Sequence, residues 1–138
     1  MEDFVTFEIA KKLKEKGFPQ SPDCFNYSSY YDWDGLRKIH SLSNASVWFD
    51  PNISRDNLYF APIISQVLKW LREEHHLHFE FVGAAYGYNL IISDTPDKGG
   101  TDRYYSHAND DGPNDGGAWD SFEDCALYGI NYTLDNLI

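Results

Sequence analysis

The sequence predicts an α+β fold: a single two-layer domain over residues 1–138, in which about three helices pack on a mainly antiparallel sheet. Two patterns predict this class. Apolar residues recur at helical spacing in separate segments, and the stretches between them alternate with period two and are broken by Gly and Asp turns. A chain of 138 residues with 42% hydrophobic residues is long enough for one core and short for two.

The first helix is predicted from Thr6 to Lys16. Thr6 is a good N-cap residue, and an apolar stripe follows it at Phe7, Ile9, Ala10 and Leu13. Gly17 fits the position just after the helix, where a left-handed backbone is common. Phe18 can then fold back on Leu13, as in a Schellman ending.

Residues 19–60 are rich in aromatic residues and turn formers, and we expect short strands around 24–31, 36–41 and 45–49. The Asp34-Gly35 pair between the first two segments predicts a hairpin. A second helix is predicted next, with Pro62 at its first position and its end at about His75.

Directly after this helix the hydrophobic period changes to that of a strand. Leu77, Phe79 and Phe81 alternate with other residues, and Gly83 to Gly87 allow the chain to reverse into YNLIIS. These residues predict a β-hairpin with one buried face, and TDRYYSH predicts a third strand.

The last helix is predicted to begin after Ser121, which opens an S-x-x-D pattern that resembles a capping box. Its apolar stripe includes Cys125, which we therefore expect to be a core thiol. Gly129 lies inside this helix at a cost of roughly 1 kcal/mol relative to alanine. A glycine there indicates close packing against the sheet.

The charge of the chain is strongly acidic and unevenly distributed. The formal net charge is −11, and residues 94–138 contain ten acidic residues against Lys98 and Arg103 alone. Such a field disfavours nucleic acid and acidic lipid as partners and favours a basic protein. Asp110, Asp111 and Asp115, together with Trp119, form the predicted interaction surface.

The loop HANDDGPNDGG, residues 107–117, holds most of these acids, and we compared it with a calcium-binding loop. With Asp111 at position 1, Pro113 falls at position 3 and Phe122 at position 12, where calcium needs an oxygen ligand and a glutamate. We therefore expect a solvated, mobile connection.

Three histidines, His75, His76 and His78, lie close together in REEHHLH. They lack the i,i+4 spacing with which a helix presents two zinc ligands, so the sequence favours a polar helix end and predicts neither a metal site nor a cofactor. No nucleophile elbow, P-loop or dinucleotide motif is present, and we assign no catalytic residue. One function that would use these histidines or His107 is that of a metal-assisted hydrolase, and we keep it as an alternative to a binding function.

The compartment is predicted from cysteine usage and hydropathy. Cys24 and Cys125 form no C-x-x-C pair, the N-terminus has no apolar signal region, and no apolar run approaches eighteen residues. We expect free thiols in a cytoplasmic protein that does not associate with membranes.

Three stretches, TFEIAKKLKEKGF, APIISQVLKWLREEH and ALYGINYTLDNLI, resemble a family of short uncharacterised proteins encoded in gut Bacteroidetes genomes, prophages and mobile elements. The resemblance implies an accessory protein of a phage or mobile element, and family members commonly have a Lys-Gly-like ending where this chain has His75-His76. Combined with the charge, it favours a non-enzymatic protein-interaction domain. The alternative is a DNA mimic that inhibits a nucleic-acid-binding protein.

Overall fold

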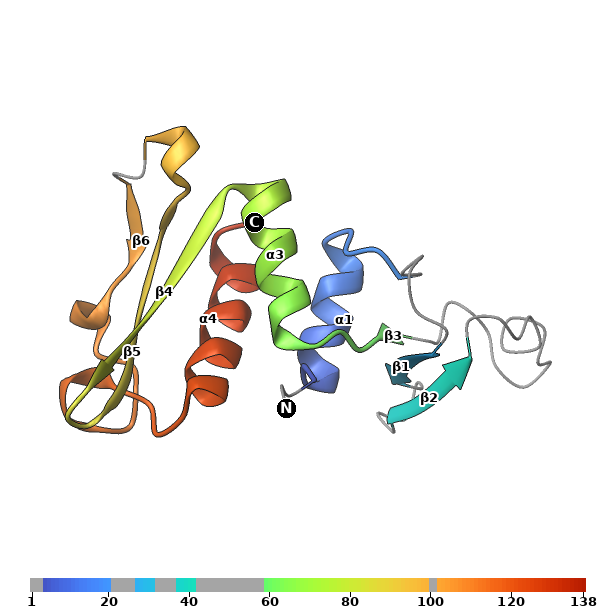
Figure 1. The fold of residues 1–138 in the computed structure, drawn as a ribbon, viewed down its shortest axis with the longest axis horizontal. Coiled ribbons are helices and arrows are strands. Elements are labelled where there is room, and N and C mark those ends of the chain that lie inside the picture. The colour runs from blue at the N-terminus through green and yellow to red at the C-terminus, as the bar shows by residue number, and fades with distance from the viewer. Residues whose placement is uncertain (1–3, 21–26, 32–36, 42–58, 100–101) are drawn as a thin grey trace. The chain divides into compact units, whose positions relative to one another are not determined.

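The computed structural model describes residues 4–20, 27–31, 37–41, 59–99 and 102–138 (Figure 1). The α+β class is confirmed, since the described residues contain three α-helices and antiparallel sheets. The chain divides into two compact units, Phe4–Ile63 and Ile64–Ile138, the second of which also includes Met1–Asp3. That all residues form a single domain stays a prediction.

In the N-terminal unit, helix α1 (Phe7–Glu15) has both of its predicted ends. The Ile9 N–H donates to the Thr6 side chain at 3.3 Å, which confirms the N-cap. At the other end Gly17 has a φ of +92°, and the Phe18 N–H donates to the Leu13 carbonyl at 2.9 Å. This bond, together with the Gly17 N–H to the Lys14 carbonyl at 3.2 Å, completes a Schellman motif.

The sheet of this unit has the order β2-β1-β3, with β1 (Tyr27–Tyr31), β2 (Arg37–Ser41) and β3 (Tyr59–Phe60) all antiparallel. The pairing of β1 with β2 confirms the predicted hairpin. Its Asp34-Gly35 turn and the strand expected at 45–49 lie outside the described residues. The Tyr31 hydroxyl donates to the Val5 carbonyl at 2.6 Å and so ties the sheet to the chain that precedes α1.

Helix α3 spans Ile64–His75. The sequence predicted its start at Pro62, and the observed start is two residues later. The Pro62 carbonyl accepts a hydrogen bond from the Val5 N–H at 3.0 Å, and Ile63 forms an antiparallel bridge with Phe4. Both residues are therefore held in an extended pairing, which overrides the local preference of proline for the first helical turn.

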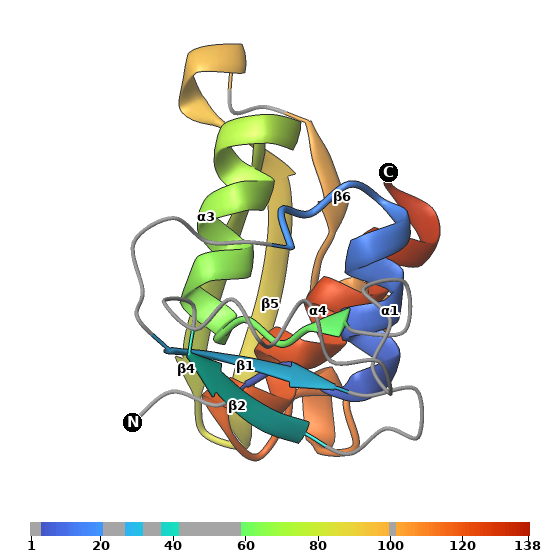
Figure 2. The same cartoon turned by 90° about the vertical axis from the view of Figure 1, so that its right-hand side faces the viewer.

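The C-terminal unit is a sheet with the order β4-β5-β6, formed by β4 (Leu77–Ala84), β5 (Gly87–Asp94) and β6 (Arg103–Tyr105). The predicted hairpin and third strand are thus confirmed. Phe79 pairs with Ile92 and Phe81 with Leu90, so these four side chains share one face of the sheet. Helices α3 and α4 (Phe122–Asn136) lie against that face (Figures 1 and 2).

Helix α4 begins as predicted, because the Asp124 N–H donates to the Ser121 hydroxyl at 3.1 Å. Its glycine is a contact point with the sheet. A Cβ on Gly129 would lie 2.7 Å from Leu90 Cδ2 and 3.0 Å from Phe79 Cε2, which confirms the expected close packing. Among the described residues, no helix combines the length and the apolar character that a membrane span requires.

Gly129→Ala should therefore destabilise the protein. Overpacking a filled core costs about 1–3 kcal/mol, and the better helix propensity of alanine returns about 1 kcal/mol, so we expect a net loss of up to about 2 kcal/mol. Urea unfolding followed by circular dichroism measures this free energy. Gly83→Ala in β4 is the matched control, since its Cβ would meet nothing within 4 Å. A gain of about 1 kcal/mol in Gly129→Ala, which is the full helix-propensity benefit, would contradict the packing described above.

Candidate interaction surface: the acidic loop

The loop of residues 107–117 has a defined backbone fold. It contains two short 3-10 turns, His107–Asn109 and Asp115–Gly117. Between them the Gly112 N–H donates to the Gly117 carbonyl at 3.2 Å, and the Asn114 N–H donates to the Ala118 carbonyl at 3.0 Å. The segment is therefore closed by its own backbone hydrogen bonds, and that it is mobile stays a prediction.

The glycine content of the loop follows from this closure. A Cβ at Gly112 would lie 2.2 Å from the Gly117 carbonyl oxygen and 2.4 Å from that of Ala118, far inside van der Waals contact. Two backbone segments therefore touch at a place where only glycine fits.

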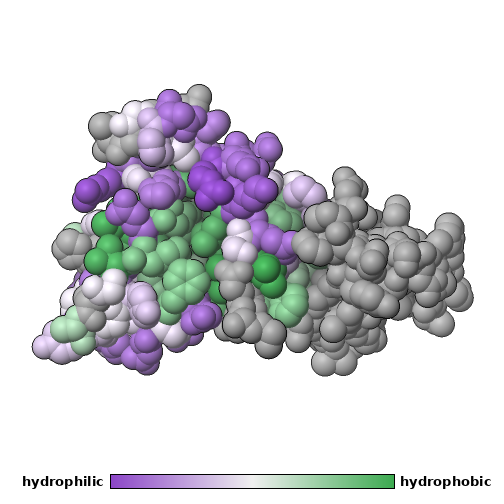
Figure 3. Space-filling model, in the orientation of Figure 1, coloured by the Kyte–Doolittle hydropathy of each residue, from purple (hydrophilic) through white to green (hydrophobic). Residues whose placement is uncertain are grey.

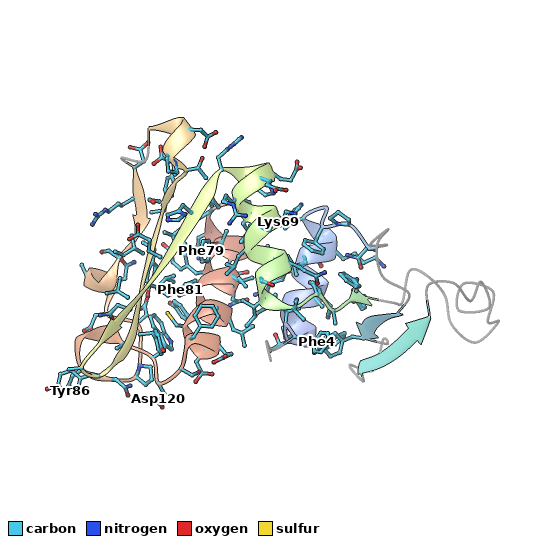
Figure 4. All side chains as sticks on the ribbon, viewed as in Figure 1. Phe4, Lys69, Phe79, Phe81, Tyr86 and Asp120 are labelled. Carbon is cyan, nitrogen blue, oxygen red and sulfur yellow. The ribbon has the colours of Figure 1, made fainter. Side chains whose placement is uncertain are left out.

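The loop is attached to the hairpin at its C-terminal end. The Tyr88 N–H donates to the Trp119 carbonyl at 2.8 Å, and the Trp119 N–H donates to the Tyr88 carbonyl at 2.9 Å. The Asn114 side-chain amide donates to the Tyr86 carbonyl and to Asp120 Oδ1, each at 2.7 Å. Figure 4 accordingly places Tyr86 and Asp120 at the same end of the unit.

Asp111 is the acceptor on which two tyrosines converge. Its Oδ2 accepts hydrogen bonds from the Tyr105 hydroxyl at 2.9 Å and from the Tyr128 hydroxyl at 2.8 Å. Tyr105 comes from β6 and Tyr128 from α4, so one carboxylate links the loop to a strand and a helix. Burial, and then the hydrogen bond to Asp111, raises the pKa of both tyrosines above its ordinary value.

Trp119 is buried and does not belong to the exposed surface of the loop. Only 7% of it is exposed, and its ring centroid lies 4.8 Å from that of Tyr128. Tyr105, itself 2% exposed, contacts Tyr132 at 4.9 Å between ring centroids. We predicted Trp119 as part of the interaction surface, and its observed place is in this aromatic support.

The acids of the loop face outward. Asp110, Asp111 and Asp115 are exposed, as is Asp120 just after the loop. No described lysine or arginine forms an ion pair with any of these four residues. Asp110 has a φ of +55°, a left-handed conformation that aspartate and asparagine tolerate better than most residues. Asp110 and Asp115 thus keep the exposure that the predicted surface requires.

The two units differ in their balance of acidic and basic residues. Residues 64–138 hold thirteen acidic and four basic residues, whereas residues 4–63 hold seven of each. All thirteen acids except Asp94 and Glu123 are exposed. The negative charge is therefore a property of the C-terminal unit, and the described part of the N-terminal unit includes the lysine-rich helix α1.

The three histidines have separate neighbours. The His75 ring stacks edge-on against Trp70 at 4.7 Å, His76 Nδ1 lies 3.8 Å from Asp97 Oδ2, and His78 Nε2 lies 3.6 Å from Glu80 Oε1. His76 also has a φ of +57°, which turns the chain from α3 into β4. In the part of the chain that the structure describes, no three His, Cys, Asp or Glu residues gather as metal ligands would.

Cys125 is the core thiol that the sequence predicts. It is fully buried in α4, and burial raises the pKa of its thiol to about 12. A thiol in this environment is protonated at neutral pH and therefore a poor nucleophile.

The chain matches no protein-family model, no curated protein and no solved structure.

The stability of the protein should fall at alkaline pH. An unfolded cysteine ionises around pH 9, whereas folded Cys125 keeps its proton until about pH 12, so between these values the unfolded state binds fewer protons. The unfolding free energy should then drop by up to about 1.4 kcal/mol per pH unit for this one group. Tyr105 and Tyr128, whose folded pKa values are also raised, add to the loss above about pH 10.

Urea unfolding at intervals between pH 7 and pH 11 tests this prediction. In Cys125→Ala the decline should begin later, near the ordinary ionisation range of tyrosine. A free energy that stays constant from pH 8 to pH 11 in the wild-type protein would show that these groups are not held protonated by the fold.

Proposed function

We propose that residues 64–138 form an acidic, non-enzymatic interaction module that binds a basic protein partner. The observation that carries this proposal is the separation of charge along the chain, thirteen acids against four bases in residues 64–138 and seven of each in residues 4–63. A field of one sign steers an oppositely charged protein and raises its association rate.

The acidic loop is the part of this module that best suits recognition. Its backbone is fixed by the hydrogen bonds to Tyr86 and Tyr88, and Asp111 is bound to two tyrosines. Asp110 and Asp115 are thereby presented from an ordered loop. Acids that are already positioned lose less conformational entropy on binding than acids on a flexible chain.

The DNA-mimic hypothesis is the narrower form of the same proposal. Its partner would be a nucleic-acid-binding protein whose phosphate groove accepts these carboxylates in place of phosphates. The acidic surface supports it, because such a groove is lined by lysine and arginine. A phage or mobile-element origin and a cytoplasmic location belong to the same proposal.

Neutralising the loop should weaken capture of the partner. We expect Asp110→Asn with Asp115→Asn to reduce recovery of a basic protein from nuclease-treated lysate by about tenfold, because close charge pairs contribute well over 1 kcal/mol to such interfaces. Asparagine tolerates the positive φ at position 110, so the loop should keep its fold. The lysate comes from the organism that encodes the chain, and quantitative mass spectrometry reads the recovery.

The matched control is Glu73→Gln with Glu74→Gln, which removes the same charge from exposed positions on α3. Equal losses in both double variants would mean that only total charge matters and would remove the loop from the proposal. Capture of no basic protein at low salt would contradict the proposed function itself. If the captured protein binds DNA, competition between DNA and the chain decides whether mimicry is involved.

A further inference from the structure

Strand β4 is the long edge of the C-terminal sheet. The order β4-β5-β6 leaves β4 with eight residues at one edge and β6 with three at the other. Among the described residues no backbone group pairs with the outer side of β4. A short edge strand has too few backbone groups to pair well with another strand, whereas a long edge strand offers a row of backbone donors and acceptors.

The hydrogen bonds that β5 makes on the side away from β4 determine which backbone groups of β4 point outward from the sheet. Both backbone groups of Tyr88 bond to Trp119, and the Asp94 N–H bonds to Asp102, so even-numbered residues of β5 face away from β4. Its odd-numbered residues therefore bond to the even-numbered residues of β4. The N–H and C=O groups of Phe79 and Phe81 accordingly point outward from the free edge.

Apolar side chains flank this edge. Phe79 and Phe81 are only half-buried, and the Phe81 ring lies 4.7 Å from that of Phe122 on α4. Figure 4 shows both phenylalanines between β4 and the helical layer, and Figure 3 shows hydrophobic atoms exposed in the same area. A strand added here would gain both backbone hydrogen bonds and burial of the rings.

We infer that β4 pairs with β4 of a second copy of the chain, antiparallel and centred on Phe79. Each Phe79 would then lie opposite the partner's Phe79, and each Leu77 opposite the partner's Phe81, with their outward backbone groups hydrogen-bonded. His78 would face the partner's Glu80 at a non-hydrogen-bonded pair, where side chains approach most closely.

The charges of β4 select this occupant and this register. His78 and Glu80 share the outer face of the sheet, where they are 38% and 54% exposed. An imidazole N–H can donate to a carboxylate, so the pair is self-complementary across a two-fold axis at Phe79. An axis at Glu80 would set two glutamates against each other, and an axis at Phe81 would set Glu80 against Val82.

Salt should strengthen this association. Each copy carries a net charge of −11, and bringing two copies together is opposed by a repulsion that added salt screens. Binding of a basic partner through the acidic loop would show the opposite dependence, since salt screens its attraction. The inference is independent of the proposed function, and the sign of the salt effect separates the two.

Sedimentation velocity of the full chain over a concentration series at about 50 and 500 mM salt tests the inference, since these concentrations bracket the physiological screening length. We expect a monomer–dimer equilibrium that shifts toward dimer at the higher salt. His78→Glu should weaken the dimer about tenfold, because two favourable cross-strand pairs become repulsive. The swap His78→Glu with Glu80→His should restore it.

Ala108→Glu is the charge-matched control, because it adds one negative charge at an exposed position after β6, away from the β4 edge. Its dimer should match that of the wild-type protein. A monomer at every concentration up to the order of 1 mM, where even weak interfaces associate, would overturn the inference. So would a dimer that His78→Glu leaves unchanged, or a swap variant that fails to recover although circular dichroism shows it folded.

Discussion

The two backbone hydrogen bonds between Tyr88 and Trp119 are the constraint on which the C-terminal unit depends. They attach the segment that follows the acidic loop to the side of β5 that faces away from β4, immediately after the hairpin turn. A Cβ at Gly87 would lie 2.1 Å from the Trp119 carbonyl oxygen, so the contact exists only because position 87 is glycine. From this point the chain enters α4 at Ser121, and the ring of Trp119 is placed against that of Tyr128.

This attachment also explains how a strongly acidic segment stays folded. The loop contributes the exposed carboxylate of Asp111 as an acceptor, and hydrogen bonds to a carboxylate are stronger than those between neutral groups. Tyr105 and Tyr128 satisfy that carboxylate from two different elements, so the loop, the sheet and α4 are joined by side chains as well as by the backbone. Asp111 serves the fold through these two hydrogen bonds, and the carboxylates of Asp110 and Asp115 beside it are left to solvent.

The predictable features were those set by neighbouring residues. Thr6 and Gly17 define the ends of α1, Ser121 the start of α4, and the period-two pattern from Leu77 the strand β4, because caps and strand faces depend on local geometry. Gly129 was read correctly because a glycine inside a helix needs a packing reason.

The features that sequence reasoning missed all depend on contacts between distant residues. Pro62 is extended because it pairs with Val5, which no local signal announces. Trp119 is buried because it pairs with Tyr88. Asp111 resembles its neighbours Asp110 and Asp115 in the sequence and differs only in meeting two tyrosines. The one usable signal was the aromatic run before the loop, whose hydroxyl groups need partners when they are buried.

Most of the acidic residues in the C-terminal unit are exposed to solvent. Stability of the C-terminal unit rests on its buried aromatic and aliphatic side chains and on close backbone contacts, and of the three aspartates in the loop only Asp111 accepts side-chain hydrogen bonds from this core. Exposed acids of one sign repel one another and oppose compaction. Residues 64–138 keep thirteen acids against four bases in spite of that cost, whereas residues 4–63 are balanced. Asp94, Asp111 and Asp120 accept hydrogen bonds within the unit, but their roles do not require so large an excess of acids over bases. This excess is the physical case for an oppositely charged partner.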